Sequence, residues 1–197
     1  MMLKFVLALG VALILADPAR AADGKALFAA KGCVACHGDD GRKAMAATPH
    51  LAGQNAAYLL RQMTEIADGV RSSPPLKPMK PAIDKTTPDE RKAMADWLAL
   101  QPAAEVAAGD AGKAEKGAIL FEEHGCIGCH GMDGTKPLAD YPFLAAQRKD
   151  YIATQIRAIR DEVRSTRRAR LMVANVRKFT DVEAEQLAEF LSQVKRK

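Results

Sequence analysis

Apolar residues recur along most of this chain at the spacing of amphipathic helices. In residues 55–68 and 149–163 the apolar positions lie three and four apart, which predicts two helices of about four turns each. Shorter segments of the same kind, 24–31 and 115–124, predict one helix ahead of each of two cysteine pairs. No segment alternates convincingly between apolar and polar residues, so the expected fold class is all-α.

Two further helices have a recognisable start. Thr87 is followed three residues later by Glu90, and Thr180 by Glu183, which is the spacing of a capping box. Pro88 takes the first helical position of the earlier helix, where its missing N–H breaks no helical hydrogen bond. These signals predict that two helices begin directly after the threonines.

The N-terminal segment has the pattern of an export signal. Lys4 precedes an apolar run from Phe5 to Ala16, and Ala19-Arg20-Ala21 supplies small residues where a signal peptidase cleaves. The alternative is a membrane anchor, but a spanning helix needs roughly twenty apolar residues and this run has only twelve. We expect residues 1–21 to be a signal peptide, cleaved after Ala21 or Ala22, and the mature protein to be soluble in the periplasm.

The rest of the chain repeats itself at a fixed offset of 93 residues without a gap. Small residues between 102 and 113 predict a linker, so residues 22–101 and 114–197 are expected to form two duplicated domains. Each domain has roughly 80 residues, a size at which a bound group helps to complete the core. The coinciding residues include Gly24 with Gly117, Phe28 with Phe121, Pro49 with Pro142, Gln54 with Gln147, Tyr58 with Tyr151, Gln62 with Gln155 and Arg71 with Arg164.

The net charge gives no reason to expect a nucleic-acid partner. The whole sequence has 29 basic and 24 acidic residues. Removing residues 1–21 takes away Lys4, Arg20 and Asp17 and leaves 27 basic and 23 acidic residues. This excess of positive charge is small. The four cysteines are more informative, because export changes how they are interpreted.

Each expected domain contains one Cys-x-x-Cys-His motif, which is the attachment motif for c-type haem. The two cysteine sulfurs form thioethers with the haem vinyl groups, and the histidine that follows lies under the iron and coordinates it. We therefore expect two covalent haem c groups, one in each domain. The residues are Cys33, Cys36 and His37 in the first domain and Cys126, Cys129 and His130 in the second.

Three other uses of the cysteines explain less of the pattern. Two Cys-x-x-Cys pairs can hold one zinc ion, but these pairs lie in different domains and each is followed by a histidine. A thioredoxin-like redox pair belongs in an α/β domain, and no strand is predicted here. Structural disulfides suit an exported chain but leave the repeated histidine unexplained.

The repeat also selects the second axial ligand of each iron. Met79 and Met172 are the only methionines of the mature chain that coincide, and each lies 42 residues after its haem histidine. The alternative is a chance pair of core methionines. His50 and His124 coincide with no other histidine, so bis-histidine ligation of both haems is not expected. Histidine and methionine together fill both axial positions, which suits electron transfer rather than bond-making chemistry.

With these motifs the chain resembles the class I cytochromes c, and its doubled form resembles the diheme cytochrome c4 family of bacterial periplasms. The resemblance covers nearly all of the mature chain, including residues 49–54. It implies an electron carrier between a quinol-oxidising complex or dehydrogenase and a terminal oxidase. It also implies that the first and last helices of each domain cross. The residues that fit this crossing are Gly24, Phe28 and Trp97 in the first domain and Gly117, Phe121 and Phe190 in the second.

The second domain departs from this pattern. Residues 141–147 match the glutamine segment only loosely. Residues 136–140 and the arginines before Met172 are similar to the haem subunit of flavocytochrome c sulfide dehydrogenase. That similarity implies a second function, a haem subunit in a heterodimer whose catalysis takes place on a flavin chain. A third class, a haem enzyme such as a peroxidase or a thiosulfate-oxidising cytochrome, would require one axial ligand to be displaced or replaced.

Arginines cluster before Met172, where the first domain has only Arg71, Lys77 and Lys80. One explanation is a solvated helix face with contacts to haem propionates. The other is a docking surface for an acidic partner, in which case the second domain carries more of the docking. The cluster consists of Arg157, Arg160, Arg164, Arg167, Arg168 and Arg170.

Overall fold

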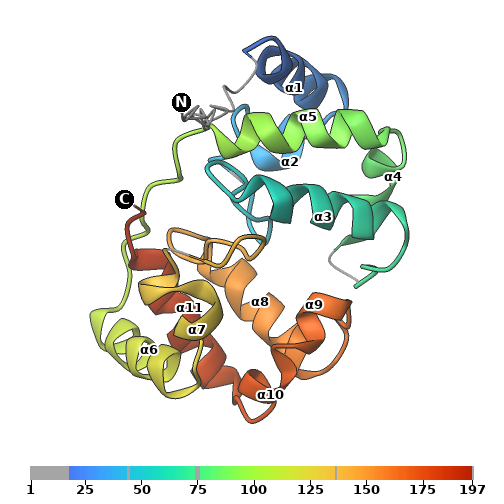
Figure 1. Ribbon diagram of the computed structural model, residues 1–197. Coiled ribbons are helices and arrows are strands. Elements are labelled where there is room, and N and C mark those ends of the chain that lie inside the picture. The colour runs from blue at the N-terminus through green and yellow to red at the C-terminus, as the bar shows by residue number, and fades with distance from the viewer. Residues whose placement is uncertain (1–17, 44, 74–75, 136, 197) are drawn as a thin grey trace, which may run out of the picture.

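The computed structural model describes residues 18–43, 45–73, 76–135 and 137–196, and these residues form helices and no strands. The expected all-α fold class is confirmed. Two groups of helices lie one beside the other, and an extended segment after α5 connects them (Figure 1). Of the predicted signal peptide only residues 18–21 are described, so its cleavage stays a prediction. No helix in the described ranges is long and apolar enough to cross a membrane.

In the first group, α1 crosses α5, and α3 packs against α5. The Asn55 side chain accepts a hydrogen bond from the backbone N–H of Tyr58 and so starts α3 close to its predicted position. α1 begins at Pro18, upstream of the predicted residue 24, in an alanine-rich stretch that favours helix. The elements are α1 (Pro18–Ala30), α2 (Val34–His37), α3 (Ala56–Ala67), α4 (Lys80–Ile83) and α5 (Pro88–Ala99).

The second group repeats this arrangement, with α6 across α11 and α8 against α11. α6 begins inside the predicted linker, because Asp110 accepts a hydrogen bond from the Lys113 N–H at 2.9 Å and caps the helix. α8 ends three residues before its predicted end, ahead of Glu162 with φ 55°. The elements are α6 (Ala111–Glu123), α7 (Ile127–His130), the 3₁₀ helix η2 (Met132–Gly134), α8 (Lys149–Arg160), α9 (Arg167–Arg170), α10 (Val173–Val176) and α11 (Asp181–Gln193).

Both predicted capping boxes are confirmed. Thr87 accepts a hydrogen bond from the Glu90 N–H at 3.2 Å, and the Glu90 carboxylate accepts one from the Thr87 N–H at 2.8 Å. Thr180 and Glu183 form the same pair, at 3.2 and 2.7 Å. Each box satisfies two backbone donors at a helix start, so α5 and α11 begin where the sequence indicates.

The crossing of first and last helices depends on glycine at one position in each domain. A Cβ on Gly24 would overlap the Ala93 carbonyl, and a Cβ on Gly117 would overlap the Gln186 carbonyl. Aromatic rings pack beside each crossing. The ring centroids are 5.3 Å apart for Phe28 and Trp97, and 5.8 Å apart for Phe121 and Phe190.

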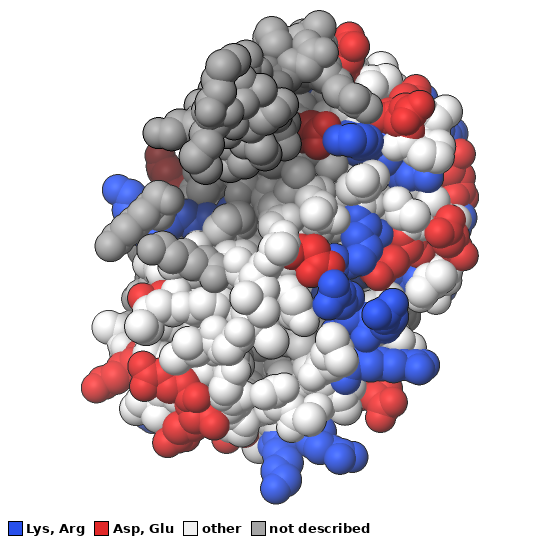
Figure 2. Space-filling view, viewed as in Figure 1, with Lys and Arg blue, Asp and Glu red and all other residues white. Residues whose placement is uncertain are grey.

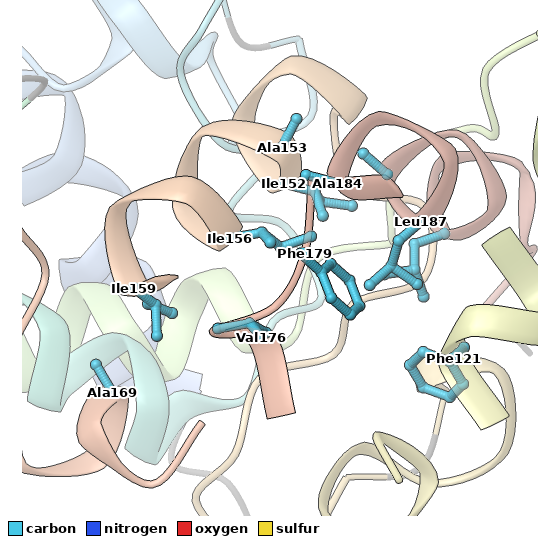
Figure 3. Close-up of a cluster of buried hydrophobic side chains, with 12 residues drawn as sticks. Phe121, Ile152, Ala153, Ile156, Ile159, Ala169, Val176, Phe179, Ala184 and Leu187 are labelled. Atoms are coloured by element: carbon cyan, nitrogen blue, oxygen red, sulfur yellow. The ribbon is translucent and has the colours of Figure 1, made fainter. Parts of the chain in front are cut away.

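Each domain has its own apolar core, and the apolar face of its long amphipathic helix packs into that core. In the second domain Ile152, Ile156 and Ile159 of α8 belong to the same buried cluster as Phe179 and Leu187 (Figure 3). In the first domain the corresponding face of α3 buries Leu59, Met63 and Ile66 against α5. Both cores face the cavity described next, so the fold positions apolar walls around it.

Candidate haem-binding sites

Each Cys-x-x-Cys-His motif lies on a single short helix, α2 or α7, that ends at a glycine. Gly38 has φ 76° and Gly131 has φ 70°, a left-handed conformation that glycine adopts without strain. Cys33 and Cys126 are half-buried, whereas Cys36 and Cys129 are exposed. All four cysteines are free thiols, so the two pairs are not structural disulfides. They remain available to form thioethers.

The two motif histidines are held in matching orientations. The Nδ1–H of His37 donates to the Pro49 carbonyl at 3.1 Å, and that of His130 donates to the Pro142 carbonyl at 3.2 Å. Burial lowers the pKa of both rings, which keeps them neutral. This leaves Nε2 as the free lone pair, and Nε2 of His130 is buried with no hydrogen-bond partner. A hydrogen bond from Nδ1–H to a backbone carbonyl, which leaves Nε2 free, is typical of histidine that binds a metal.

The two predicted methionine ligands occupy equivalent places. Met79 and Met172 are the N-terminal caps of α4 and α10, and both are half-buried against their domain's core. Met79 lines the same cavity as His37, and Met172 lines it with His130. Ligation itself stays a prediction. The structure places the predicted ligand pairs on the walls of one cavity.

The remaining methionines and histidines take other positions. Met63 and Met94 are buried in the core of the first domain, as packing residues. Met45 and Met132 are exposed. His124 stacks edge-on against Phe179, with ring centroids 4.5 Å apart, and bonds to the Asn175 carbonyl.

The cavity is shared by both domains. Its empty space, including its openings to solvent, is about 1770 Å³, and its lining runs from Phe28 in the first domain to Leu191 in the second. Its walls are mostly apolar and come from both domains, so each domain offers an apolar wall against which one large flat group could pack.

A reciprocal pair of glutamines joins the two domains at their interface. The Gln54 amide donates to the Phe143 carbonyl at 2.9 Å, and its oxygen accepts from the Phe143 N–H at 2.7 Å. Gln147 makes the same two bonds with the backbone of His50, at 2.9 and 2.7 Å. Gln54 coincides with Gln147 in the repeat, and His50 with Phe143, so the contact has two-fold character.

A second reciprocal contact involves the buried Arg71 and the half-buried Arg164. Arg71 donates to Gln155 at 3.0 Å and to the Tyr151 hydroxyl at 3.2 Å. Arg164 donates to Gln155 at 2.8 Å and to Gln62 at 2.9 Å. Although burial acts to raise the pKa of Tyr151, the charges of Arg71 and Arg164 outweigh it and lower that pKa.

These arginines fit an anionic group in the cavity. Within the described residues neither Arg71 nor Arg164 forms an ion pair, and the Nε of each is buried without a hydrogen-bond partner. Both side chains line the cavity. A buried charge without a counter-ion is costly. Haem propionates would supply carboxylates at this place, so the polar part of the cavity fits the expected group as well as the apolar part does.

The internal repeat carries a signal for this contact. Tyr58 with Tyr151, Gln62 with Gln155, and Arg71 with Arg164 all coincide in the repeat. In the sequence Arg164 belongs to the arginine cluster before Met172. The structure separates it from its neighbours there, because it lies at the domain interface.

Comparison with known proteins decides the family. A sequence model of the cytochrome c family matches residues 21–101 and again residues 114–195. The chain belongs to the cytochrome c family. As a cytochrome c with two such domains it has the form of cytochrome c4, and it is an electron carrier rather than an enzyme. Cytochrome c domains carry covalent haem, and two domains fit two haems.

Three relatives show how far this likeness extends. This cytochrome c is 33% identical over 203 residues to a "Thiosulfate dehydrogenase electron acceptor" from Stutzerimonas stutzeri (strain A1501), covering 94% of this chain and 93% of that protein. It is 32% identical to a cytochrome c4 from Azotobacter vinelandii over 76% of each chain. The crystal structure of reduced cytochrome c4 from Pseudomonas stutzeri matches with a TM-score of 0.77 at 27% identity, covering 89% of this chain and 98% of that one.

Proposed function

We propose that this chain is a periplasmic cytochrome c with two haems, ligated by His37 with Met79 and by His130 with Met172, that relays electrons from a dehydrogenase or quinol-oxidising complex to a terminal acceptor such as an oxidase. The supporting observation is the pairing of an oriented histidine and a methionine on the walls of the same cavity in both domains. Export rests on the N-terminal signal pattern.

The side chains of this cytochrome form a rigid binding site for each haem. Bound haem would supply the one-electron chemistry at its iron. The carbonyls of Pro49 and Pro142 fix the tautomer and direction of the histidine rings. The thioether cysteines and the apolar walls keep the group in place and exclude water. If His37 with Met79 and His130 with Met172 hold the two irons as proposed, these side chains would leave no coordination site for a substrate.

The donor is proposed to be a dehydrogenase of the kind that oxidises thiosulfate. The support is the relative named as an electron acceptor of thiosulfate dehydrogenase, which aligns with this cytochrome along nearly the whole of both chains. The haem-subunit function, exemplified by flavocytochrome c sulfide dehydrogenase, is the alternative. Purification from the native source separates the two, since a carrier elutes alone and a subunit elutes with a flavoprotein.

Ligand substitution tests the proposal directly. In the oxidised holoprotein each His/Met haem contributes a methionine–iron charge-transfer band at the red end of the spectrum. Met79→Ala and Met172→Ala are each expected to remove about half of that band and to lower the reduction potential of one haem, because loss of methionine disfavours the reduced iron. Optical and spectroelectrochemical titration measure both effects.

The control is Met45→Ala, which removes an exposed methionine that lines no part of the cavity. It is expected to leave the band and both potentials unchanged. A high-spin haem in the wild-type protein, or an unchanged band in either ligand variant, would contradict the proposed ligand set.

A further inference from the structure

The six arginines before Met172 do not form one surface. Arg157 and Arg160 of α8 pair with Asp181 of α11, at 3.3 and 2.8 Å. Arg168 pairs with Asp140 at 2.5 Å, and the half-buried Arg164 donates to Gln62 across the domain interface. The side chains of these four arginines are engaged in contacts within the protein. Only Arg167 and Arg170 remain as free charges of the predicted cluster.

The free charges extend along the chain past Met172. Four exposed residues form what we term the basic rim: Arg167, Arg170, Arg177 and Lys178. Among the described residues none of these four side chains takes part in an ion pair or a hydrogen bond. They bracket Leu171, which is 58% exposed, and the proposed iron ligand Met172. Because Met172 lines the shared cavity, the rim lies at the edge of the part of that cavity that belongs to the second domain.

The face beside the basic rim is uncharged. Basic side chains gather over α9 and at the end by α10, and white surface without charges separates them from acidic side chains over α6 (Figure 2). The face thus has an uncharged centre, a positive border on one side and a negative border on the other.

The first domain lacks this arrangement. The positions equivalent to Arg170, Arg177 and Lys178 are Lys77, Asp84 and Lys85. Asp84 forms an ion pair with Lys80 at 2.5 Å, so the Asp84 carboxylate neutralises the charge of Lys80 next to Met79. The two domains share a fold but present different charges beside their methionines.

We propose that the basic rim of the second domain, together with Leu171, is the docking surface for an acidic face of a redox protein. Exposed apolar residues can exclude water at the centre of such a contact, and charges at its border steer the approach and set the orientation. One electron leaves the reduced partner and is taken up by the oxidised haem of the second domain, with no bond made or broken. This inference rests on the proposed function.

A protein fits this face better than an anionic membrane. The acidic border over α6, with exposed Glu115, Glu122 and Glu123, would be repelled by a negatively charged lipid surface. With an acidic protein partner the same border selects one orientation. The basic rim attracts the partner's acidic face, and the acidic border over α6 repels it.

The experiment measures the rate at which an acidic plant-type two-iron ferredoxin, in its reduced form, transfers electrons to the oxidised holoprotein in a stopped-flow instrument. Arg167→Glu combined with Arg170→Glu is expected to slow this reaction about tenfold at low ionic strength and to flatten its salt dependence. The difference is expected to vanish near 1 M salt, where the Debye length falls to about 3 Å.

The matched control is Lys25→Glu combined with Lys85→Glu in the first domain, where both lysines are exposed, which makes the same change in net charge away from the rim and from α6. It is expected to change the rate less than about twofold. Equal slowing by both double variants, or by neither, would overturn the docking surface. So would loss of binding to phosphatidylglycerol vesicles in the rim variant with no change in rate, since the rim would then serve a membrane.

The charge-transfer band and both potentials, recorded on each variant, separate this inference from the proposed function. If the rim variant keeps both and reacts as fast as the wild type, the docking surface fails and the carrier function stands. If the wild-type holoprotein accepts no electrons from the ferredoxin at any ionic strength, both fail together.

Discussion

His50 sits at the domain interface, where its backbone bonds to Gln147 and its Nδ1 is buried without a partner. Burial, together with the nearby charges of Arg148 and Arg196, lowers the pKa of its ring from 6.5 to about 4. The unfolded chain therefore binds a proton at a higher pH than the folded chain does. The stability that His50 supports is complete above pH 6.5 and is lost as the pH falls towards 4.

This gives a prediction for His50→Phe, which places the residue of the equivalent position 143 at position 50. The variant is expected to lose less stability than the wild type between pH 6.5 and 4, since phenylalanine takes up no proton. Denaturant unfolding of the holoprotein at several pH values measures this. All other titratable groups are the same in the two proteins, so the difference between their stability curves is the informative quantity. Parallel stability curves would refute the role of His50.

Single residues differ in how far the sequence reveals them. The haem motifs and both predicted methionines follow from spacing alone, because a covalent motif and an internal repeat need no fold to be recognised. Arg71 and Gln155 were visible only as members of coinciding pairs. Their contact joins residues 84 apart, in different domains, and only the folded chain brings them together.

At the scale of the helices, substitution of Gly117 tests whether the α6–α11 crossing depends on close approach of the two backbones. Gly117→Ala is expected to lower the free energy of unfolding by about 1–3 kcal/mol, because the new Cβ overlaps the backbone carbonyl of Gln186 and the helices must move apart. Gly112→Ala on the same helix meets only the Asp110 side chain, at 3.4 Å.

That control is expected to be neutral or to stabilise by up to about 1 kcal/mol, since alanine favours helix over glycine. Thermal and denaturant unfolding of the holoproteins compare the two. If both substitutions had the same effect, helix propensity rather than close approach would explain the glycine.

Helix starts were predicted well where the signal is local. The two capping boxes and the Asn55 cap depend on residues three apart, which the sequence displays directly. The start of α6 was missed because Asp110 lies in a run of alanine and glycine that resembles a linker. The end of α8 was missed because a left-handed conformation at Glu162 has no marker such as glycine.

At the scale of the whole molecule, Arg196 forms hydrogen bonds with both domains. Its guanidinium donates to the carbonyls of Ala145 and Gly53, both at 2.8 Å, and lies over the Phe143 ring. Burial lowers its pKa to about 10. Arg196→Ala is expected to cost roughly 1.5–3 kcal/mol and to speed amide exchange near Gly53.

Hydrogen exchange measured by mass spectrometry on the holoprotein tests this. The neighbouring Lys195→Ala removes an exposed side chain without these contacts and is expected to change neither stability nor exchange. Unaltered exchange near Gly53 in the Arg196 variant would show that the other interface contacts hold the domains without it.

The number and type of domains could be predicted, but not how they meet. The repeat indicated two copies of one domain, and the described residues fold as two similar groups of helices. The interface includes hydrogen bonds between residues about 80 to 100 positions apart, such as Gln54 with Phe143 and Gln147 with His50. No periodic pattern encodes such contacts, so they emerge only from the assembled structure.

The reciprocal glutamines bear on how such a chain could have arisen. If each half is numbered as a separate copy, residue 54 of either copy contacts residue 50 of the other, and residue 71 contacts residue 62. This is the self-complementary pattern of an isologous homodimer. A single-domain ancestor with glutamine and arginine at these positions would already have carried both sides of the contact. Fusion of two gene copies would then have made a concentration-dependent pair into a permanent one.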